Sequence, residues 1–175
     1  AKSITPFYGK TGLNAGLILM NLTRTRQFPD GGWLEVNLRA YDRYETEIAL
    51  ADQDILNIVF SQYPEKMYEL GCEWNYRPWQ CKLGQNYCPI TDNEGTSLIH
   101  GNTRAFVTDK EPKFKAVFDS WMDYELTTPI RSLYHVIEVN MAKANIQGLN
   151  LECGTLANID DILVKQLKRY LDIYD

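Results

Sequence analysis

The stretch Asn14–Met20 reads NAGLILM and joins a turn to an apolar run. The run Leu17–Met20 is short and continuous, which suits a β-strand buried on both faces of a parallel sheet. Ala15 and Gly16 are small enough for a ligand to approach the backbone, and the Asn14 amide offers a donor and acceptors to hydroxyl groups. An ordinary turn before a strand is the alternative. We predict a strand over 17–20 with a candidate ligand contact at its start.

Helices and short apolar runs alternate along the rest of the chain. Further strands are expected at Met67–Leu70 and at Leu98–Ile99. Helical periodicity, prolines and capping residues predict helices around 21–26, 33–48, 52–63, 112–124, 132–144 and after Asn158. Such alternation predicts an α/β fold, in which ligands gather at the carboxyl ends of the strands. We expect residues 1–175 to form a single domain.

Two helices carry predicted core faces. In the segment 33–48, the expected inward residues are Leu34, Leu38, Tyr41 and Ile48. In the segment 52–63 they are Ile55, Ile58 and Val59.

The composition is that of a soluble globular protein. Hydrophobic residues make up 45% of the 175 residues and charged residues 23%. The net charge of −5 gives no basic footprint, so nucleic acid is not an expected partner. No run of 18 apolar residues is present, so no membrane span is expected in this chain. The 11 Tyr, 6 Phe and 4 Trp can form sugar-stacking surfaces, although aromatic residues more often fill cores.

Four cysteines indicate an oxidising compartment. Cys72, Cys81 and Cys88 lie in a long loop over 71–95, and Cys153 follows later. An even number favours disulfides, and four cysteines allow three pairings. A zinc site is the alternative, but it would favour close Cys-x-x-Cys pairs, which the sequence lacks. We predict at least one disulfide.

Asn21-Leu22-Thr23 is an N-glycosylation sequon. It follows the apolar run directly, so a buried and unused position is the alternative.

A second motif opens the predicted helix at residue 52. Asp52 and Gln53 place a carboxylate and an amide at the helix start, where they can bind sugar hydroxyls. The alternative is that Asp52 only caps the helix.

A third motif, His100-Gly101-Asn102, follows the predicted strand at Leu98–Ile99. A neutral histidine can bind a divalent metal, and Gly101 can leave room for a phosphate. Arg104 and Lys110 follow, and either can neutralise a diphosphate. Isolated histidines are more often structural, and such cations are often only solvated.

Taken together and in this order, the motifs resemble the glycosyltransferase family that includes glycogenin and the glucoside and xyloside xylosyltransferases. The stretch 14–21 is similar to that family's Asn-Ser-Gly strand, and 52–57 is similar to its Asp-Gln helix start. Residues 72–78 and 100–102 are most similar to the glucoside xylosyltransferases. The resemblance covers about residues 8–125.

This resemblance implies a GT-A fold, a UDP-sugar donor, Mn²⁺ and retention at the anomeric carbon. It implies that His100 is a metal ligand and that Asp52 and Gln53 are catalytic. Substrate contacts are implied at Asn14, Ala15, Gly16, Asp52, Gln53, Trp74, Asn75, Gly101, Asn102 and Lys110, with Arg104 as the other candidate at the diphosphate. For retention, Asp52 is the motif carboxylate that can act as nucleophile, and same-face attack is the family's usual interpretation.

The implied reaction is transfer of xylose from UDP-xylose to O-linked glucose on epidermal-growth-factor-like repeats of a glycoprotein. The implied location is the lumen of the Golgi or endoplasmic reticulum, with the full-length protein a single-pass type II membrane protein. A transferase of the same family with another UDP-sugar is one alternative. A non-catalytic sugar-binding or assembly module is another.

The family's Asp-x-Asp motif, which supplies two metal ligands, lies upstream of the Asn-Ser-Gly strand. Only thirteen residues precede Asn14, and none is Asp. We therefore expect the chain to be the C-terminal part of a GT-A domain without the nucleotide-binding half. Tested alone, it is expected to bind Mn²⁺ and UDP-xylose weakly and to show no transfer.

Overall fold

The computed structural model describes residues 4–144, 153 and 155–174. The chain divides into two compact units, Ala1–Glu69 (unit 1) and Leu70–Asp175 (unit 2), and each is described by itself. The prediction that residues 1–175 form a single partial catalytic domain stays a prediction.

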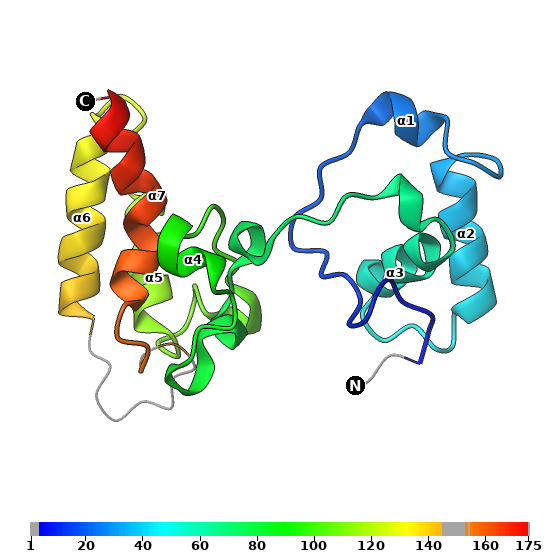
Figure 1. Cartoon of the computed structure of the whole chain (residues 1–175), viewed down its shortest axis with the longest axis horizontal. Coiled ribbons are helices and arrows are strands. Elements are labelled where there is room, and N and C mark those ends of the chain that lie inside the picture. The colour runs from blue at the N-terminus through cyan, green and yellow to red at the C-terminus, as the bar shows by residue number, and fades with distance from the viewer. Residues whose placement is uncertain (1–3, 145–152, 154, 175) are drawn as a thin grey trace. The chain divides into compact units, whose positions relative to one another are not determined.

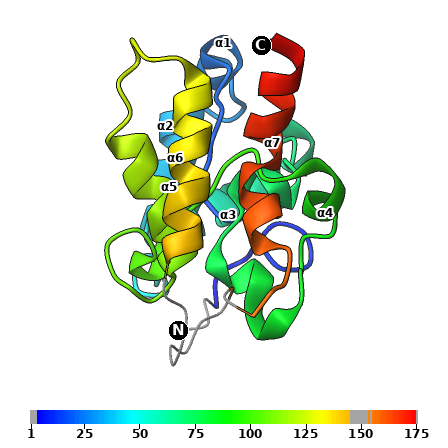
Figure 2. The same cartoon turned by 90° about the vertical axis from the view of Figure 1, so that its left-hand side faces the viewer.

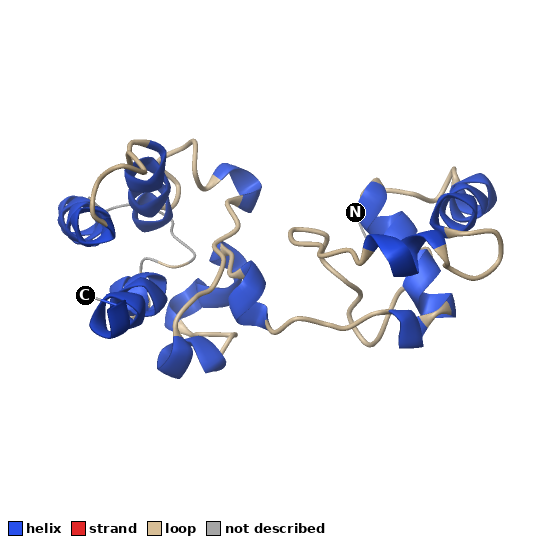
Figure 3. Cartoon of the chain, turned by 90° about the horizontal axis from the view of Figure 1, so that it is seen from above, coloured by secondary structure: helices blue, strands red, loops and turns tan. Residues whose placement is uncertain are grey.

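The α/β prediction is not confirmed. Across the described residues the regular structure consists of helices, and no strand is present (Figure 3). The segment 17–21 forms no regular structure, and Leu19 is 93% exposed. Leu98–Ile99 contributes only an isolated parallel bridge between Ile99 and Tyr76, and Met67–Leu70 forms no regular structure. An apolar run becomes a strand only where a neighbouring strand takes its backbone hydrogen bonds. Among the described residues, Leu17–Met20 has no such neighbour, and Leu98–Ile99 pairs only with Tyr76.

The described residues of unit 1 form three α-helices and a short 3₁₀ helix. These are α1 (Leu22–Arg26), α2 (Trp33–Tyr44), α3 (Asp52–Gln62) and η1 (Pro64–Lys66). Helix α2 packs against α3 through a small core of Val36, Ala40, Ile58 and Val59 (Figure 1). The ring of Phe28 lies edge-on to Trp33 and to Tyr63, with centroids 5.2 Å apart in both pairs, and covers this core.

The predicted inward face of α2 is wrong. Val36 and Ala40 are buried, whereas Leu34 is 71% exposed and Leu38 and Tyr41 are also exposed. Ile48 lies beyond the end of the helix. Both sets of side chains recur at helical spacing, so periodicity alone does not tell which of them meets α3. In α3 the prediction is confirmed for Ile58 and Val59, which are buried, and Ile55 packs on them.

Unit 2 begins with a cross-linked segment. It contains η2 (Cys72–Asn75), η3 (Pro78–Gly84) and α4 (Ile90–Glu94), where a long loop was predicted. Disulfides join Cys72 to Cys88 and Cys81 to Cys153, so the predicted disulfide is confirmed and all four cysteines are paired.

Three longer helices complete unit 2 after the short η4 (Asn102–Arg104). They are α5 (Pro112–Met122), α6 (Ile130–Lys143) and α7 (Ile159–Tyr174), and they pack side by side (Figures 1 and 2). Pro112 occupies the first turn of α5, where its missing N–H costs nothing. Residues Phe114, Leu133, Ile137 and Ile162 anchor the core between them. None of the described helices combines the length and apolar character that a membrane crossing requires.

Candidate functional site

In unit 1 the side chain of Asn57 holds the loop that precedes the first motif. Its Oδ1 accepts a hydrogen bond from the Leu13 backbone N–H at 2.6 Å, and its Nδ2 donates to the Leu13 carbonyl at 3.0 Å. Asn57 is 4% exposed, so these bonds are shielded from water. Gly12 has a φ of +77°, and a Cβ there would lie 2.9 Å from Asn57 Oδ1. Asn57 therefore attaches this loop to helix α3 by hydrogen bonds.

The first and second predicted motifs meet in this unit. Gln53 Oε1 accepts hydrogen bonds from Asn14 Nδ2 at 2.9 Å and from the Ala15 N–H at 3.3 Å. Asn14 Oδ1 in turn accepts from the Gly16 N–H at 3.0 Å. Predicted separately from the sequence, the two motifs form one polar cluster beside the start of α3.

Asp52 does not cap α3, so that alternative is wrong. The helix begins after Ala51, and no side chain caps it. The buried carboxylate of Asp54 instead accepts from the N–H groups of Ala49 and Leu50, at 2.7 and 2.8 Å. Asp52 is exposed and forms no hydrogen bond with any other described residue. Its carboxylate is therefore available to a ligand at the helix start.

In unit 2 the backbone brings the segment around Asn75 to the third motif. The Tyr76 N–H donates to the Leu98 carbonyl at 2.9 Å, and the His100 N–H donates to the Tyr76 carbonyl at 2.7 Å. This pairing places His100 Nδ1 2.7 Å from Asn75 Oδ1. Because an amide oxygen can only accept, Nδ1 must carry the proton, which leaves the lone pair of Nε2 free.

His100 is held in its neutral form. Partial burial lowers its pKa below the usual value of 6.5, and the positive charge of Arg77 lowers it further. A neutral imidazole with a free Nε2 and its other nitrogen held by a hydrogen bond is the form that binds a metal ion. His100 therefore fits the predicted role of a neutral ligand.

Arg77 is the functional candidate that the sequence analysis missed. It is half-buried, its burial lowers its own pKa, and its Nε lies buried without a hydrogen-bond partner among the described residues. A buried, unpartnered guanidinium donor beside a candidate metal ligand suits an anion such as a phosphate. The stretch 72–78 did point to this region, but only the effect of its charge on His100 distinguishes Arg77.

The other predicted residues of this region differ in how exposed they are. Arg104 and Lys110 are exposed, and Trp74 is 43% exposed. Asn102 Oδ1 is buried and has no partner in the described part of the chain. The ring of Phe106 lies where a Cβ of Gly101 would be, at 2.2 Å, so Gly101 is needed for this packing.

The rival zinc site is not supported. Cys72, Glu73 and Cys88 are the acidic or sulfur ligands that gather in the described residues, but Cys72 and Cys88 are bonded to each other. A disulfide sulfur is not a thiolate and does not bind zinc in this way.

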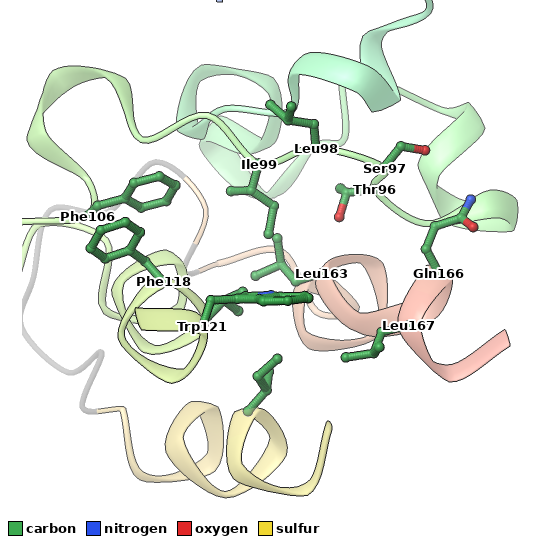
Figure 4. A pocket seen from close by; sticks show the side chains of 12 residues that line it. Thr96, Ser97, Leu98, Ile99, Phe106, Phe118, Trp121, Leu163, Gln166 and Leu167 are labelled. Carbon is green, nitrogen blue, oxygen red and sulfur yellow. The ribbon is translucent and has the colours of Figure 1, made fainter. Parts of the chain in front are cut away.

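Unit 2 also contains an apolar cleft of about 450 Å³. In Figure 4 the stacked rings of Phe106 and Phe118 lie at one end, Ser97 and Gln166 at the other, and the indole of Trp121 between them. The hydroxyls and phosphates of a nucleotide sugar need more polar partners than this lining offers. The cleft suits an apolar group and is not a candidate sugar-nucleotide site.

The two clusters lie in different units. The individual roles that were predicted for the site residues stay predictions.

Comparison with known proteins identifies the relatives of the chain. No protein-family profile and no solved structure matches it. Over 173 residues it is 36% identical to glucoside xylosyltransferase 2 of Mus musculus, and this alignment covers 94% of this chain and 37% of the relative. It is 43% identical over 143 residues to glucoside xylosyltransferase 1 of Danio rerio, covering 77% and 35%. A glycosyltransferase-like protein LARGE of Caenorhabditis elegans is 31% identical over 93 residues, covering 51% and 14%.

These matches confirm the predicted family resemblance. The chain spans less than half the length of the curated relatives that it matches.

Proposed function

We propose that this chain, a relative of the glucoside xylosyltransferases, is part of a retaining transferase that moves xylose from UDP-xylose to O-linked glucose. The observation that carries the proposal is the pair of polar clusters, because both consist of residues at the positions that the family resemblance singled out. The similarity over 94% of the chain supports it. The proposed fold of the whole catalytic domain is GT-A.

The proposed acceptor is a glycoprotein that carries glucose on epidermal-growth-factor-like repeats, and the proposed location is the lumen of the Golgi or endoplasmic reticulum. Two disulfides support an oxidising compartment. A type II membrane anchor in the full-length protein stays part of this proposal.

His100 is the proposed metal ligand, with Asn75 fixing its tautomer. When bound, Mn²⁺ supplies Lewis-acid stabilisation of the diphosphate. The neutral imidazole offers Nε2 to the ion, while the Asn75 oxygen keeps the proton on Nδ1.

Arg77 is proposed to act on the leaving diphosphate. Negative charge grows on the phosphate oxygen as the bond to the sugar breaks, and a fixed guanidinium stabilises that charge. Partial burial strengthens this interaction because little water screens it. Arg104 and Lys110 are more exposed and are proposed only as outer contacts.

The cluster of unit 1 is proposed to bind sugar hydroxyls. Asn14 and Gln53 are already joined by a hydrogen bond, so their remaining polar atoms are fixed in direction. Asp52 is exposed at the helix start and can accept from a hydroxyl or act as the nucleophile. Same-face attack is the alternative to a covalent intermediate.

The experiment compares the full-length wild type with His100→Ala, using UDP-xylose, Mn²⁺ and an O-glucosylated acceptor. We expect kcat to fall by about 100-fold or more, because stabilisation of the leaving charge is lost. Asn75→Ala should lower kcat by about 10-fold, since it frees the orientation of the histidine. The control is His135→Ala, which changes the chain's other, exposed histidine on α6.

Equal rates for wild type and His100→Ala would make His100 structural and remove the metal assignment. Donor hydrolysis with a panel of UDP-sugars separates xylose from glucose or galactose. No hydrolysis of any donor by the wild type would favour a sugar-binding module.

A further inference from the structure

We propose that Asn21 carries an N-linked glycan. The proposal does not depend on the transferase function. It rests on the local structure at Asn21-Leu22-Thr23 and on the disulfides of unit 2.

The sequon is exposed, which removes the alternative that it is buried. Asn21 and Thr23 are both exposed, and Leu22 is 59% exposed. The preceding apolar run does not cover the sequon, because its own Leu19 faces solvent at 93% exposure. A glycan at Asn21 therefore has free space around it in unit 1.

The conformation of Asn21 leaves its amide nitrogen available. Asn21 is the N-cap of α1, with an extended backbone at φ −79° and ψ 102°. Its Oδ1 accepts from the Arg24 N–H at 3.0 Å, and its Nδ2 forms no hydrogen bond to any described residue. The helix cap uses the oxygen, whereas glycosylation uses the nitrogen, so the two are compatible.

The second residue that defines the sequon is also available. The hydroxyl of Thr23 makes no hydrogen bond within the described residues, whereas Thr25 Oγ1 donates to the Asn21 carbonyl at 2.8 Å. Thr25 thus holds the first turn of the helix, and Thr23 remains free for recognition by the modifying enzyme.

The disulfides give an independent reason to expect modification. All four cysteines are paired, which indicates folding in an oxidising lumen. N-glycosylation of Asn-x-Ser/Thr sequences takes place in the same secretory compartment, and Asn21 lies in the chain's single sequence of this type.

The co-reactant is a lipid-linked oligosaccharide diphosphate. The Asn21 nitrogen forms a bond to the anomeric carbon, and the bond from that carbon to the diphosphate oxygen breaks. The lipid diphosphate leaves with the electron pair, and one amide proton is released. The remaining N–H and the capping oxygen are retained.

The test expresses the full-length protein in a secretory eukaryotic cell and measures Asn21 occupancy in the total pool, including protein retained in the endoplasmic reticulum. Peptide-N-glycosidase in ¹⁸O water converts glycosylated Asn21 to a labelled Asp, which mass spectrometry detects. We expect the label in wild type and in Thr23→Ser, which preserves the sequon. We expect its loss in Thr23→Ala.

Asn21→Asp is the matched folding control, because an aspartate caps the helix equally well but cannot accept the glycan. Asn21→Asp should migrate faster on a denaturing gel than the wild type, by the shift that corresponds to the loss of one glycan. An unlabelled Asn21 in wild-type protein whose disulfides have formed would overturn the proposal, and so would a label that persists in Thr23→Ala.

Discussion

Units 1 and 2 hold their candidate site residues in different ways. Unit 2 has both disulfides and a core that runs through α5, α6 and α7. Unit 1 has no cysteine, and its buried apolar side chains are Val36, Ala40, Leu56, Ile58 and Val59. Much of its order comes from buried polar side chains, above all Asn57 and Asp54.

This difference separates structural from functional effects. In unit 2, His100 and Asn75 lie on a scaffold that disulfides and apolar packing stabilise without them. In unit 1, Gln53 and Asn57 hold the loop that carries Asn14, so the polar residues next to the candidate contacts also maintain the fold. A substitution in the cluster of unit 2 should therefore change the chemistry alone. A substitution in the cluster of unit 1 should change both the chemistry and the stability of the fold.

The largest expected effect comes from removing the disulfide Cys81–Cys153. Replacing both residues by alanine should lower the free energy of unfolding of unit 2 by about 4 kcal/mol, because the link closes a long loop. The residues are 72 positions apart. Denaturant unfolding measures the loss, and hydrogen exchange locates it in α5–α7. Removing Cys72–Cys88, 16 positions apart, should cost about 3 kcal/mol.

Amide protection in α2 and α3 should not change in either variant. A matching loss of protection there would show that the two units unfold together. The conclusion that each unit is stabilised separately would then be wrong.

The next effect concerns the polar scaffold of unit 1. Asn57→Ala should destabilise this unit by about 2–3 kcal/mol, because the partly buried Leu13 N–H and carbonyl lose their partners. Hydrogen exchange should become faster at residues 8–16 and stay unchanged in unit 2. Unchanged exchange in Asn57→Ala would mean that the loop holds its position without this side chain.

A smaller effect tests which face of α2 is buried. Val36→Ala should cost about 1.5 kcal/mol, since about two buried methylene equivalents are lost at ~0.8 kcal/mol each. Leu34→Ala, two positions away on the exposed face, should change stability by less than about 0.5 kcal/mol. Urea unfolding of unit 1 compares them. A larger loss in Leu34→Ala would restore the inward face predicted from the sequence.

Local signals in the sequence predicted the helices well. The predicted segments 52–63, 112–124 and 132–144 agree with α3, α5 and α6 to within two residues at each end. Pro64, Pro112 and Pro129 mark three of these boundaries, and proline acts through the backbone of its own neighbourhood. The predicted strands failed because a strand depends on a distant partner, and Leu17–Met20 has none among the described residues.

In the candidate site, too, local motifs were predicted from the sequence but contacts between distant residues were not. The motifs around Asn14 and Gln53 were found, but the hydrogen bond that joins them spans 39 positions and has no sequence signal. Arg77 was missed because its charge acts on His100 only through the pairing of Tyr76 with Leu98 and His100, which brings the two segments together.

The smallest effect concerns the protonation of His100. Burial first, and the charge of Arg77 second, keep its pKa below the usual 6.5. In His135→Gln, which leaves a single imidazole in this chain, NMR titration should find a pKa below that value. Arg77→Gln should raise the pKa of His100 only part of the way toward 6.5, because the histidine stays partly buried.

The same shift makes stability depend on pH. Since the pKa of His100 is lower in the folded state than in the unfolded state, the unfolded state takes up the proton first as the pH falls below about 6.5. This contribution to stability is therefore complete at neutral pH and decreases as the pH falls from about 6.5 through the folded-state pKa. His100→Asn should lack that decrease in urea unfolding at pH 7.5 and 5.5. A pKa of His100 at or above 6.5 would show that unit 2 does not hold this histidine neutral, and the proposed role of His100 as a neutral metal ligand would lose its basis.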